Sequence, residues 1–160
     1  AGGRDQKPGI ISEPYNSDTK LKVRGFEFTW QQPLDMLPVK GFGFTGNFTY
    51  TKQTDEVVGS PPVAGVPPQT NNLTLYYERN GLNLRVARQY TSSLISNTGT
   101  GLATWAYAYS TSRSQVDLSA GLNLQKLFGF RYNTDVTLSV WNVNNAKSQN
   151  YTQFPKEIFD

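Results

Sequence analysis

The sequence predicts an all-β fold, an antiparallel up-and-down meander of about six long strands. Six stretches alternate apolar and polar residues with a period of two, and long and short connectors take turns between them. Successive side chains of a strand point to opposite faces, so this alternation separates an apolar face from a polar one. The 14 glycines and 9 prolines suit many strands joined by turns. Such a sheet is either half of a soluble sandwich or the wall of a barrel in lipid.

Composition excludes several classes of protein. The 160 residues are enough for one domain, and a charged content of 17% is too low for a highly charged disordered chain. No apolar run approaches the roughly 18 residues of a membrane helix. Cysteine and histidine are absent, which removes disulfides, thiolate metal sites and the usual general base. We therefore expect no cofactor, no metal and no enzymatic activity. The net charge of +3 is mild and the cations are scattered, which predicts no nucleic-acid binding.

The first strands are read from alternation and from turn residues. Residues 1–20 predict a loop, because Pro and Gly recur there without periodicity. A first strand is expected at 21–31, with a β-bulge at Arg24-Gly25 where the apolar positions change from odd to even. A connector with Pro33 and Pro38 fills 32–41, since proline cannot sit inside a central strand. The second strand is expected at 42–52.

The middle of the sequence predicts a hairpin between two loops. A long loop at 53–69 leads to a third strand at 70–79. Asn80-Gly81 is the strongest hairpin signal, because both residues tolerate the positive φ of a type I′ turn. A fourth strand follows at 82–92, and then a loop at 93–113 rich in Ser, Thr and Gly. A fifth strand at 116–125 has the cleanest alternation of the chain.

A short turn at 126–131 and a sixth strand at 132–143 complete the expected wall. Residues 144–160 are interpreted as the start of a further long loop. The organisation is thus a loop at 1–20, a six-stranded wall segment at 21–143 and a loop at 144–160. In an up-and-down meander every second connector lies on the same side, so all the long connectors share one rim. Outer-membrane barrels have the same arrangement, with long loops on one side of the membrane and short turns on the other.

Strand length and aromatic placement also favour lipid over a soluble core. The expected strands are about 10 to 12 residues long, whereas soluble strands peak near about 5 or 6. Aromatic residues gather at expected strand ends, where amphipathic rings meet lipid headgroups. They are Trp30, Tyr50, Tyr77, Tyr90, Phe128, Phe130 and Tyr132. Arg88 shares the parity of the apolar residues in the fourth strand, but it lies near the long-loop end, where it could reach anionic headgroups.

Charged residues in mid-strand mark the face that would line the lumen. They are Glu27, Glu78, Arg85, Asp117 and Asp135. A water-filled lumen tolerates such residues and a tight sandwich core does not. Asp117 and Asp135 fall on neighbouring strands, but without a histidine or a cleft they are interpreted as wall residues rather than a catalytic pair. A soluble carbohydrate-binding sandwich, whose polar face would meet bulk water, remains the alternative.

The long loop at 93–113 holds the candidate ligand-binding residues. Trp105, Tyr107 and Tyr109 could stack on sugar rings or on a chelate, and Arg113 could pair with carboxylates. The alternative is a loop that packs on its own aromatic residues.

Over residues 20–154 the sequence resembles the C-terminal part of the barrel of a TonB-dependent outer-membrane receptor. The matching stretches occur in the order Gly25-Phe26-Glu27, Phe48-Thr49-Tyr50-Thr51, Val66-Pro67, Asn72-Leu73 to Glu78, Leu84-Arg85-Val86 to Gln89-Tyr90, Gln115 to Ser119, and Val140 to Asn144. The resemblance implies a barrel of about 22 strands around a separate plug, in the outer membrane of a Gram-negative bacterium. It implies that this chain is a fragment of the barrel wall without the closing strand.

The same resemblance implies energy-coupled uptake of a scarce solute, such as a siderophore, a vitamin or an oligosaccharide. Outer-membrane lipid and the solute would be partners of this segment. The TonB-type energy transducer would contact parts of the parent protein outside this chain. Six strands cannot close a barrel, which needs about eight, so the segment alone is expected neither to transport nor to fold stably. A passive porin or an adhesin barrel is the alternative in the same compartment.

Overall fold

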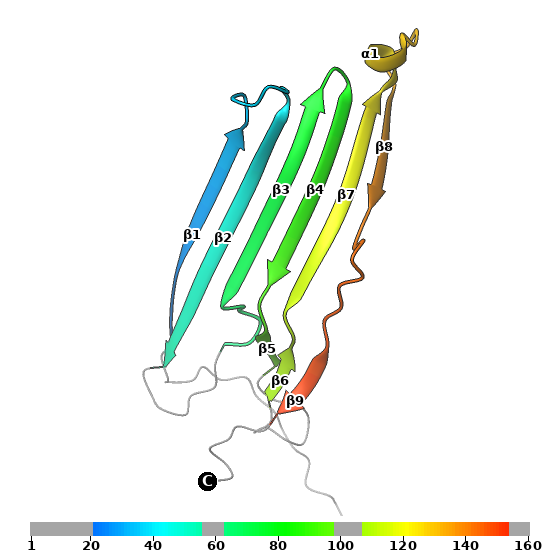
Figure 1. The fold of residues 1–160 in the computed structure, drawn as a ribbon. Coiled ribbons are helices and arrows are strands. Elements are labelled where there is room, and N and C mark those ends of the chain that lie inside the picture. Colours follow the sequence, from blue (N-terminus) through cyan, green and yellow to red (C-terminus); the bar gives the residue numbers. More distant parts are fainter. Residues whose placement is uncertain (1–20, 56–62, 98–106, 154–160) are drawn as a thin grey trace, which may run out of the picture.

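A single open sheet of six antiparallel strands forms most of the molecule in the computed structural model, which describes residues 21–55, 63–97 and 107–153 (Figure 1). Its strands are β1 (Leu21–Pro33), β2 (Phe42–Asp55), β3 (Gln69–Arg79), β4 (Leu82–Thr91), β7 (Arg113–Asn123) and β8 (Asp135–Val140). They lie in the order β1-β2-β3-β4-β7-β8, and each pairs antiparallel with the next. The predicted all-β meander is confirmed.

The strand register places almost every large apolar side chain of the sheet on the same side. Phe26 pairs with Tyr50, Phe44 with Leu75, and Val86 with Leu118. Directly paired residues of antiparallel strands project to one face, and the alternate residues project to the other. We call these the apolar face and the polar face. The apolar face comprises Phe26, Phe28, Trp30, Phe42, Phe44, Phe48, Tyr50, Leu73, Leu75, Tyr77, Leu82, Leu84, Val86, Val116, Leu118, Ala120, Leu122, Val136, Leu138 and Val140.

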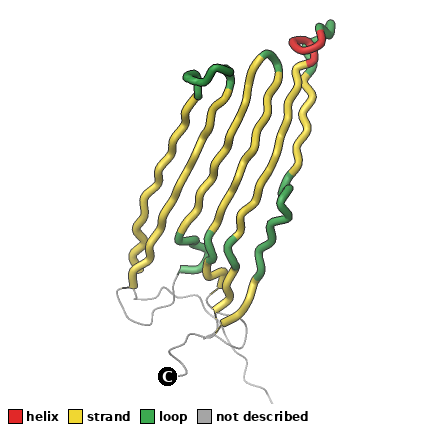
Figure 2. The backbone as a smooth tube through the Cα atoms, in the orientation of Figure 1, coloured by secondary structure: helices red, strands yellow, loops and turns green. Residues whose placement is uncertain are grey.

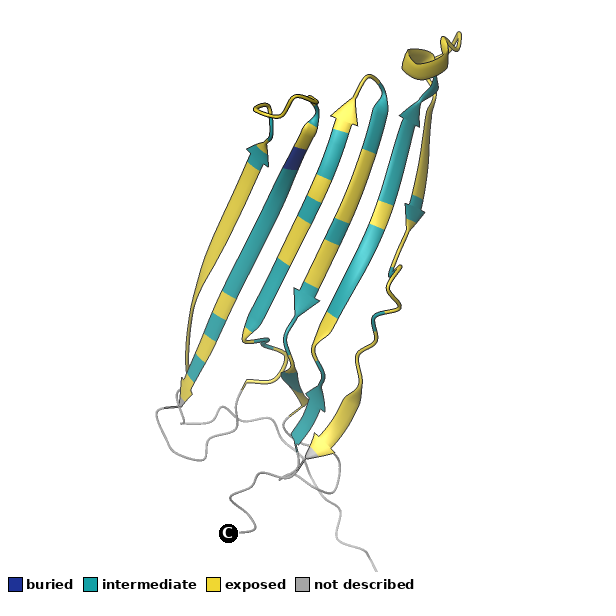
Figure 3. Ribbon diagram, viewed as in Figure 1, coloured by how far each residue is buried: buried dark blue, intermediate teal, exposed yellow. Residues whose placement is uncertain are grey.

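The apolar face is uncovered in the described part of the chain. The sheet forms one layer, and exposed residues recur along its strands (Figure 3). Phe26 is 58% exposed, Leu75 is 51% exposed and Leu138 is 66% exposed. A soluble protein rarely leaves so extended an apolar surface in water, because burial of apolar surface is the main favourable term in folding. The face therefore needs hydrocarbon or protein against it.

Aromatic contacts link neighbouring strands across this face. The Trp30 and Phe44 rings are 5.4 Å apart in an edge-to-face arrangement, and Phe42 and Tyr77 are 4.7 Å apart. Such pairs contribute about 0.5–1.5 kcal/mol each beyond the area that they bury. They stabilise the β1–β2–β3 register without a second layer.

The β-bulge expected at Arg24-Gly25 is absent, and that prediction is wrong. The β1–β2 pairing runs without interruption from Leu21, opposite Asp55, to Pro33, opposite Gly43. The change of parity instead places Leu21 and Val23 on the polar face. Consequently Lys22 and Arg24 share a face with Phe26. Pro33 ends β1. Proline is tolerated there because β1 is an edge strand of the described sheet and has no ladder partner on its outer side.

The hairpin predicted at Asn80-Gly81 is confirmed. Arg79 pairs with Leu82 across the two-residue turn, and φ is +51° at Asn80 and +88° at Gly81. Positive φ at both central residues is the requirement of a type I′ turn, whose twist matches that of the strands.

The connector predicted as a plain turn at 126–131 contains a helical turn, α1 (Leu124–Phe128). The Asn123 side chain accepts a hydrogen bond from the Lys126 backbone N–H, and Gly129 closes the turn at φ +69°. An N-cap Asn followed by a glycine in the left-handed region is sufficient for one helical turn. In the described residues no helix is long and apolar enough to cross a membrane.

The last strand of the sheet, β8, is shorter than the 132–143 expected. It ends at Val140 because Asn142 adopts φ +56°, which breaks the extended conformation. The Asn144 side chain then takes over the pairing with β7. Its amide donates to the Ser114 carbonyl at 2.8 Å and accepts from the Val116 N–H at 2.9 Å.

A second sheet lies at the long-loop end, where only loops were expected (Figure 2). It consists of β5 (Leu94–Asn97), β6 (Tyr107–Ser110) and β9 (Asn150–Gln153), in the order β5-β6-β9. The sequence predicts loops over 93–113 and 144–160, and this prediction is wrong for the residues that form β5, β6 and β9. Four residues are too few to show a period, and β6 and β9 are far apart in sequence, so their pairing has no local signal.

Candidate functional site

The polar face carries all five of the charged residues that the sequence assigns to a lumen wall. Glu27 projects from β1, Glu78 from β3, Arg85 from β4, Asp117 from β7 and Asp135 from β8. The registers place all of them opposite the apolar face. The sheet therefore brings them to one surface.

Three of these carboxylates accept hydrogen bonds from neighbouring amides. Asn47 donates to Glu27 at 2.5 Å, and Asn123 donates to Asp135 at 2.8 Å. Asp117 accepts from the Gln115 side chain and from the Asn142 backbone N–H, each at 2.7 Å. These hydrogen bonds hold the carboxylates close to the sheet. Carboxylates held in this way are suited to a hydrated surface.

Asp117 and Asp135 do not form a pair. Asp135 lies opposite Asn123 in the β7–β8 register, six positions along β7 from Asp117. At about 3.4 Å per residue that separation is about 20 Å, far beyond the spacing of two cooperating catalytic carboxylates. In the described part of the chain no group of three or more His, Cys, Asp or Glu residues could hold a metal ion.

A polar hollow lies on this face at the short-turn end of the strands. Its volume is about 740 Å³, and Glu78, Asn83, Arg85, Lys126 and Asp135 are among the residues that line it. It combines cations, carboxylates and amides from β3, β4, β7 and β8. Such a surface can form hydrogen bonds and ion pairs with a protein segment inside a barrel.

The long-loop end holds a second candidate for a ligand site. A cavity of about 460 Å³ lies between the end of β2, the 63–68 segment and the small second sheet. Tyr109 lines it, together with Tyr50, Val66 and Ile95. Tyr109 also stacks on Tyr151 with ring centroids 5.3 Å apart and planes 11° apart. A lining of apolar side chains and two tyrosines suits a flat or ring-shaped solute.

The other predicted ligand residues occupy different places. Tyr107 starts β6 and pairs with Gln153. Arg113 starts β7, where its guanidinium donates to the Gln115 side chain, and it does not line the cavity around Tyr109. Trp105 lies outside the described residues. Of the three that the structure describes, Tyr109 is the one that lines this cavity.

Two features of the wall escaped the sequence reasoning. The Tyr76 ring covers Gly43 on the polar face, and several cations lie on the apolar face. The parity of Lys52 with Tyr50 was the available signal for the cations. The expected bulge would have moved Lys22 and Arg24 to the polar face, and so it concealed their shared position.

A single layer of long antiparallel strands, with one uncovered apolar face and one polar face, defines a segment of a transmembrane β-barrel wall. The comparison with protein families agrees with this class. The family model described as TonB dependent receptor-like, beta-barrel, matches residues 2–146. The chain belongs to this family, which is an outer-membrane family of transporters and receptors. Neither the comparison with curated proteins nor the comparison with solved structures found a match.

Proposed function

We propose that this chain is part of the barrel wall of a receptor that takes up a scarce solute by energy coupling, in the outer membrane of a Gram-negative bacterium. The observation that supports the proposal is the uncovered apolar face opposite a polar wall whose carboxylates are hydrogen-bonded. Hydrocarbon tails would cover the first face and water or a plug the second. The solute would be a siderophore, a vitamin or an oligosaccharide.

The two ends of the strands would then have different roles. Loops at the long-loop end would capture the solute, with Tyr109 at the cavity described above and with Trp105, Tyr107 and Arg113 nearby in the sequence. The polar hollow at the short-turn end would face the interior of the parent barrel. The energy transducer would contact parts of the parent protein outside this chain, and no enzymatic step is involved.

Uptake by cells that carry the whole receptor tests the proposal. Radiolabelled probes of three kinds would be compared: a ferric hydroxamate siderophore, cobalamin and a maltooligosaccharide. We expect one probe to accumulate only in cells that have the receptor, and a protonophore to abolish that accumulation. Receptor-dependent entry that continues with the protonophore would instead identify a passive porin. Loss of the gene without effect on the entry of any probe would favour an adhesin barrel.

Replacement of one loop residue tests the place of capture. Tyr109→Ala should weaken binding of the transported probe to whole cells, because it removes a wall of the cavity. Tyr132→Ala is the matched control, since Tyr132 is 70% exposed and does not line this cavity. Equal binding of the probe by both variants would show that the ligand site lies elsewhere.

The soluble alternative requires a separate measurement. A carbohydrate-binding sandwich would fold without lipid, so the segment would be expressed and purified without detergent. A monodisperse monomer that melts cooperatively would contradict the membrane proposal. We expect aggregation, because the apolar face and the edge strands of the described sheet are open.

A further inference from the structure

A second hollow lies on the polar face at the level where β8 ends. Its volume is about 280 Å³, and Trp141 lines it together with Arg85, Ala87, Asp117 and Ser139. Trp141 follows the last residue of β8 and has the parity of Ser139, so its side chain lies on the polar side of the sheet. We call this recess the Trp141 hollow.

The strand registers explain why a hollow forms at this level. Ala87 pairs with Thr74 on one side and with Asp117 on the other. Its methyl group is shorter than both neighbouring side chains, so the polar surface is recessed between β3 and β7. Arg85 and Ser119 form the next pair on this face toward the short-turn end. Both also line the larger polar hollow described above, so the two hollows are adjacent.

Trp141 presents an aromatic surface that no part of the described chain covers. Its side chain is 73% exposed, and within the described segments it has no stacked ring and no acceptor for its indole N–H. Covering an exposed indole ring is favourable, because the ring is large and apolar and its N–H can still donate a hydrogen bond. The ring is therefore available to a ligand.

The charged groups of the hollow are each held at one atom and open at another. Asp117 accepts the Gln115 side-chain amide and the Asn142 backbone N–H, each at 2.7 Å, on the same oxygen, Oδ1. Its Oδ2 has no donor among the described residues. Arg85 donates through Nε to Asn83 at 3.2 Å, and its terminal NH₂ groups have no acceptor in the segments that the structure describes. The hollow thus offers a positioned acceptor and positioned donors.

Opposite charges beside an aromatic plane favour an uncharged ligand with many hydroxyl groups. Asp117 would repel an anion and Arg85 would repel a cation, whereas a hydroxyl can donate to the first and accept from the second. A glucopyranose ring has this chemistry. Its hydroxyls are equatorial, so its rim is polar and its two faces consist of C–H groups that can stack on an indole ring.

The size of the hollow also distinguishes between solutes. Sites for whole drug-sized ligands occupy about 300–1,000 Å³, and the Trp141 hollow is slightly smaller than this range. It can therefore hold one ring of a longer chain rather than a complete metal chelate.

We propose that the Trp141 hollow binds a glucopyranose ring of an oligosaccharide, with the ring stacked on Trp141 and its hydroxyls bonded to Asp117 Oδ2 and to Arg85. Asp117 lies four residues after the start of β7, which is about 14 Å along the strand at about 3.4 Å per residue. A solute captured by the loops would meet this site on its way along the polar face. The inference rests on the proposed function and narrows its solute to an oligosaccharide.

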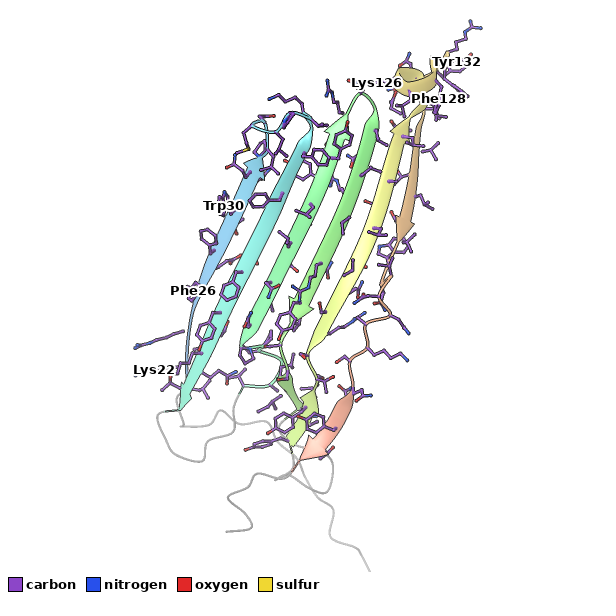
Figure 4. All side chains as sticks on the ribbon, in the orientation of Figure 1. Lys22, Phe26, Trp30, Lys126, Phe128 and Tyr132 are labelled. Atoms are coloured by element: carbon purple, nitrogen blue, oxygen red, sulfur yellow. The ribbon has the colours of Figure 1, made fainter. Side chains whose placement is uncertain are left out.

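The fluorescence of Trp141 in the whole receptor tests the inference. The contribution of Trp141 is the emission of the unaltered receptor minus that of Trp141→Phe, in neutral detergent with acrylamide as the quencher. We expect acrylamide to quench this contribution, and maltoheptaose or cellohexaose to protect it in a saturable manner. Sorbitol, an acyclic polyol, should not protect it. The difference for Trp30→Phe is the control, because Trp30 lies on β1 on the apolar face and should not respond to sugar (Figure 4).

Variants of the hollow separate ring binding from general effects on the receptor. Asp117→Asn and Arg85→Gln should each weaken the protecting affinity by about five-fold, because each removes a charged hydrogen-bonding partner. Ala87→Leu should abolish protection, since it fills the recess and leaves every polar group in place. Ala120→Leu is the matched control, because it adds the same side chain to the apolar face of the adjacent strand.

Two results would overturn the inference: no protection by either glucan, or a Trp141 contribution that acrylamide does not quench before sugar is added. The second result would mean that a protein segment of the parent covers the ring. Should Trp141→Phe fail to fold, the total emission of the unaltered receptor and of Ala87→Leu carries the same test. Energy-coupled uptake of another solute, without protection of Trp141, contradicts this inference alone, whereas a soluble protein contradicts the proposed function.

Discussion

The Tyr76 ring lies directly over Gly43 on the polar face of the wall. The two residues pair across β2 and β3, and a Cβ atom added to Gly43 would lie 2.2 Å from the Tyr76 hydroxyl oxygen and 2.3 Å from its ring carbon Cζ. Gly43 is buried as a result, although it is in a one-layer sheet. The aromatic ring covers the backbone of a glycine that has no side chain to pack, and so protects that part of the ladder from water.

Gly43→Ala should therefore destabilise the wall, because the added methyl group forces the Tyr76 ring away. Overpacking of this kind costs about 1–3 kcal/mol. Gly46→Ala is the control in the same strand, since a Cβ atom there would be 3.8 Å from its nearest neighbour. The measurement is the free energy of unfolding of the parent barrel in lipid vesicles, from urea titration. Equal values for the two variants would show that the ring moves aside without cost.

A charge introduced on the apolar face should be costly if that face meets hydrocarbon. Leu75 and Thr74 are neighbours near the middle of β3 and project to opposite faces. Leu75→Arg should lower the free energy of unfolding in vesicles by about 2–4 kcal/mol, as for other lipid-facing positions near the midplane. Thr74→Arg should have a much smaller effect, because the polar face is hydrated. A similar loss in both variants would contradict contact with lipid.

The β3–β4 turn should depend on Gly81 for two separate reasons. Its φ of +88° is unfavourable for alanine, and a Cβ atom there would lie 2.8 Å from Cβ of Lys126. Gly65 is the control, because its φ is +81° but no atom lies within 4 Å of an added Cβ. Gly65→Ala should cost only the conformational strain of about 1–2 kcal/mol, and Gly81→Ala should cost more. The difference in folding yield and unfolding free energy isolates the contact with α1.

The Asn144 side chain should protect the backbone near the start of β7 from hydrogen exchange with solvent. Asn144→Ala removes both of its hydrogen bonds to β7, which should cost about 1–3 kcal/mol for the unpaired ladder groups. Hydrogen exchange at the Val116 amide should accelerate. Asn144→Asp keeps an acceptor for that amide but no donor for the Ser114 carbonyl, so Val116 should remain protected. Unaltered exchange in the alanine variant would mean that water replaces the amide without loss.

Local pattern was sufficient for the parts of the fold that depend on neighbouring residues. Alternation identified the long strands, and Asn80-Gly81 identified the hairpin, because a period of two and a positive φ are properties of short segments. The same reasoning failed at Arg24-Gly25, where a change in apolar parity was interpreted as a bulge. The uninterrupted β1–β2 pairing shows that apolar residues near a strand end can project to the polar face.

The candidate site could be predicted from the sequence only in part. Parity was enough to select Glu27, Glu78, Arg85, Asp117 and Asp135 as members of one face, since the strands that carry them were correctly located. The distance between Asp117 and Asp135 needed the β7–β8 register. The cavity beside Tyr109 could not be predicted, because its lining comes from four separate segments of the chain, two of which contain strands of only four residues.

The amino-acid order by itself determined that this chain makes long strands with one apolar and one polar side, because side-chain direction in a strand is a local property. Pairing decided everything that depends on which strands are neighbours: the Tyr76–Gly43 contact, the small sheet of β5, β6 and β9, and the juxtaposition of Arg24 with Lys52. Register joins residues that are distant in sequence, and only the hydrogen-bonded ladders of the folded chain specify it.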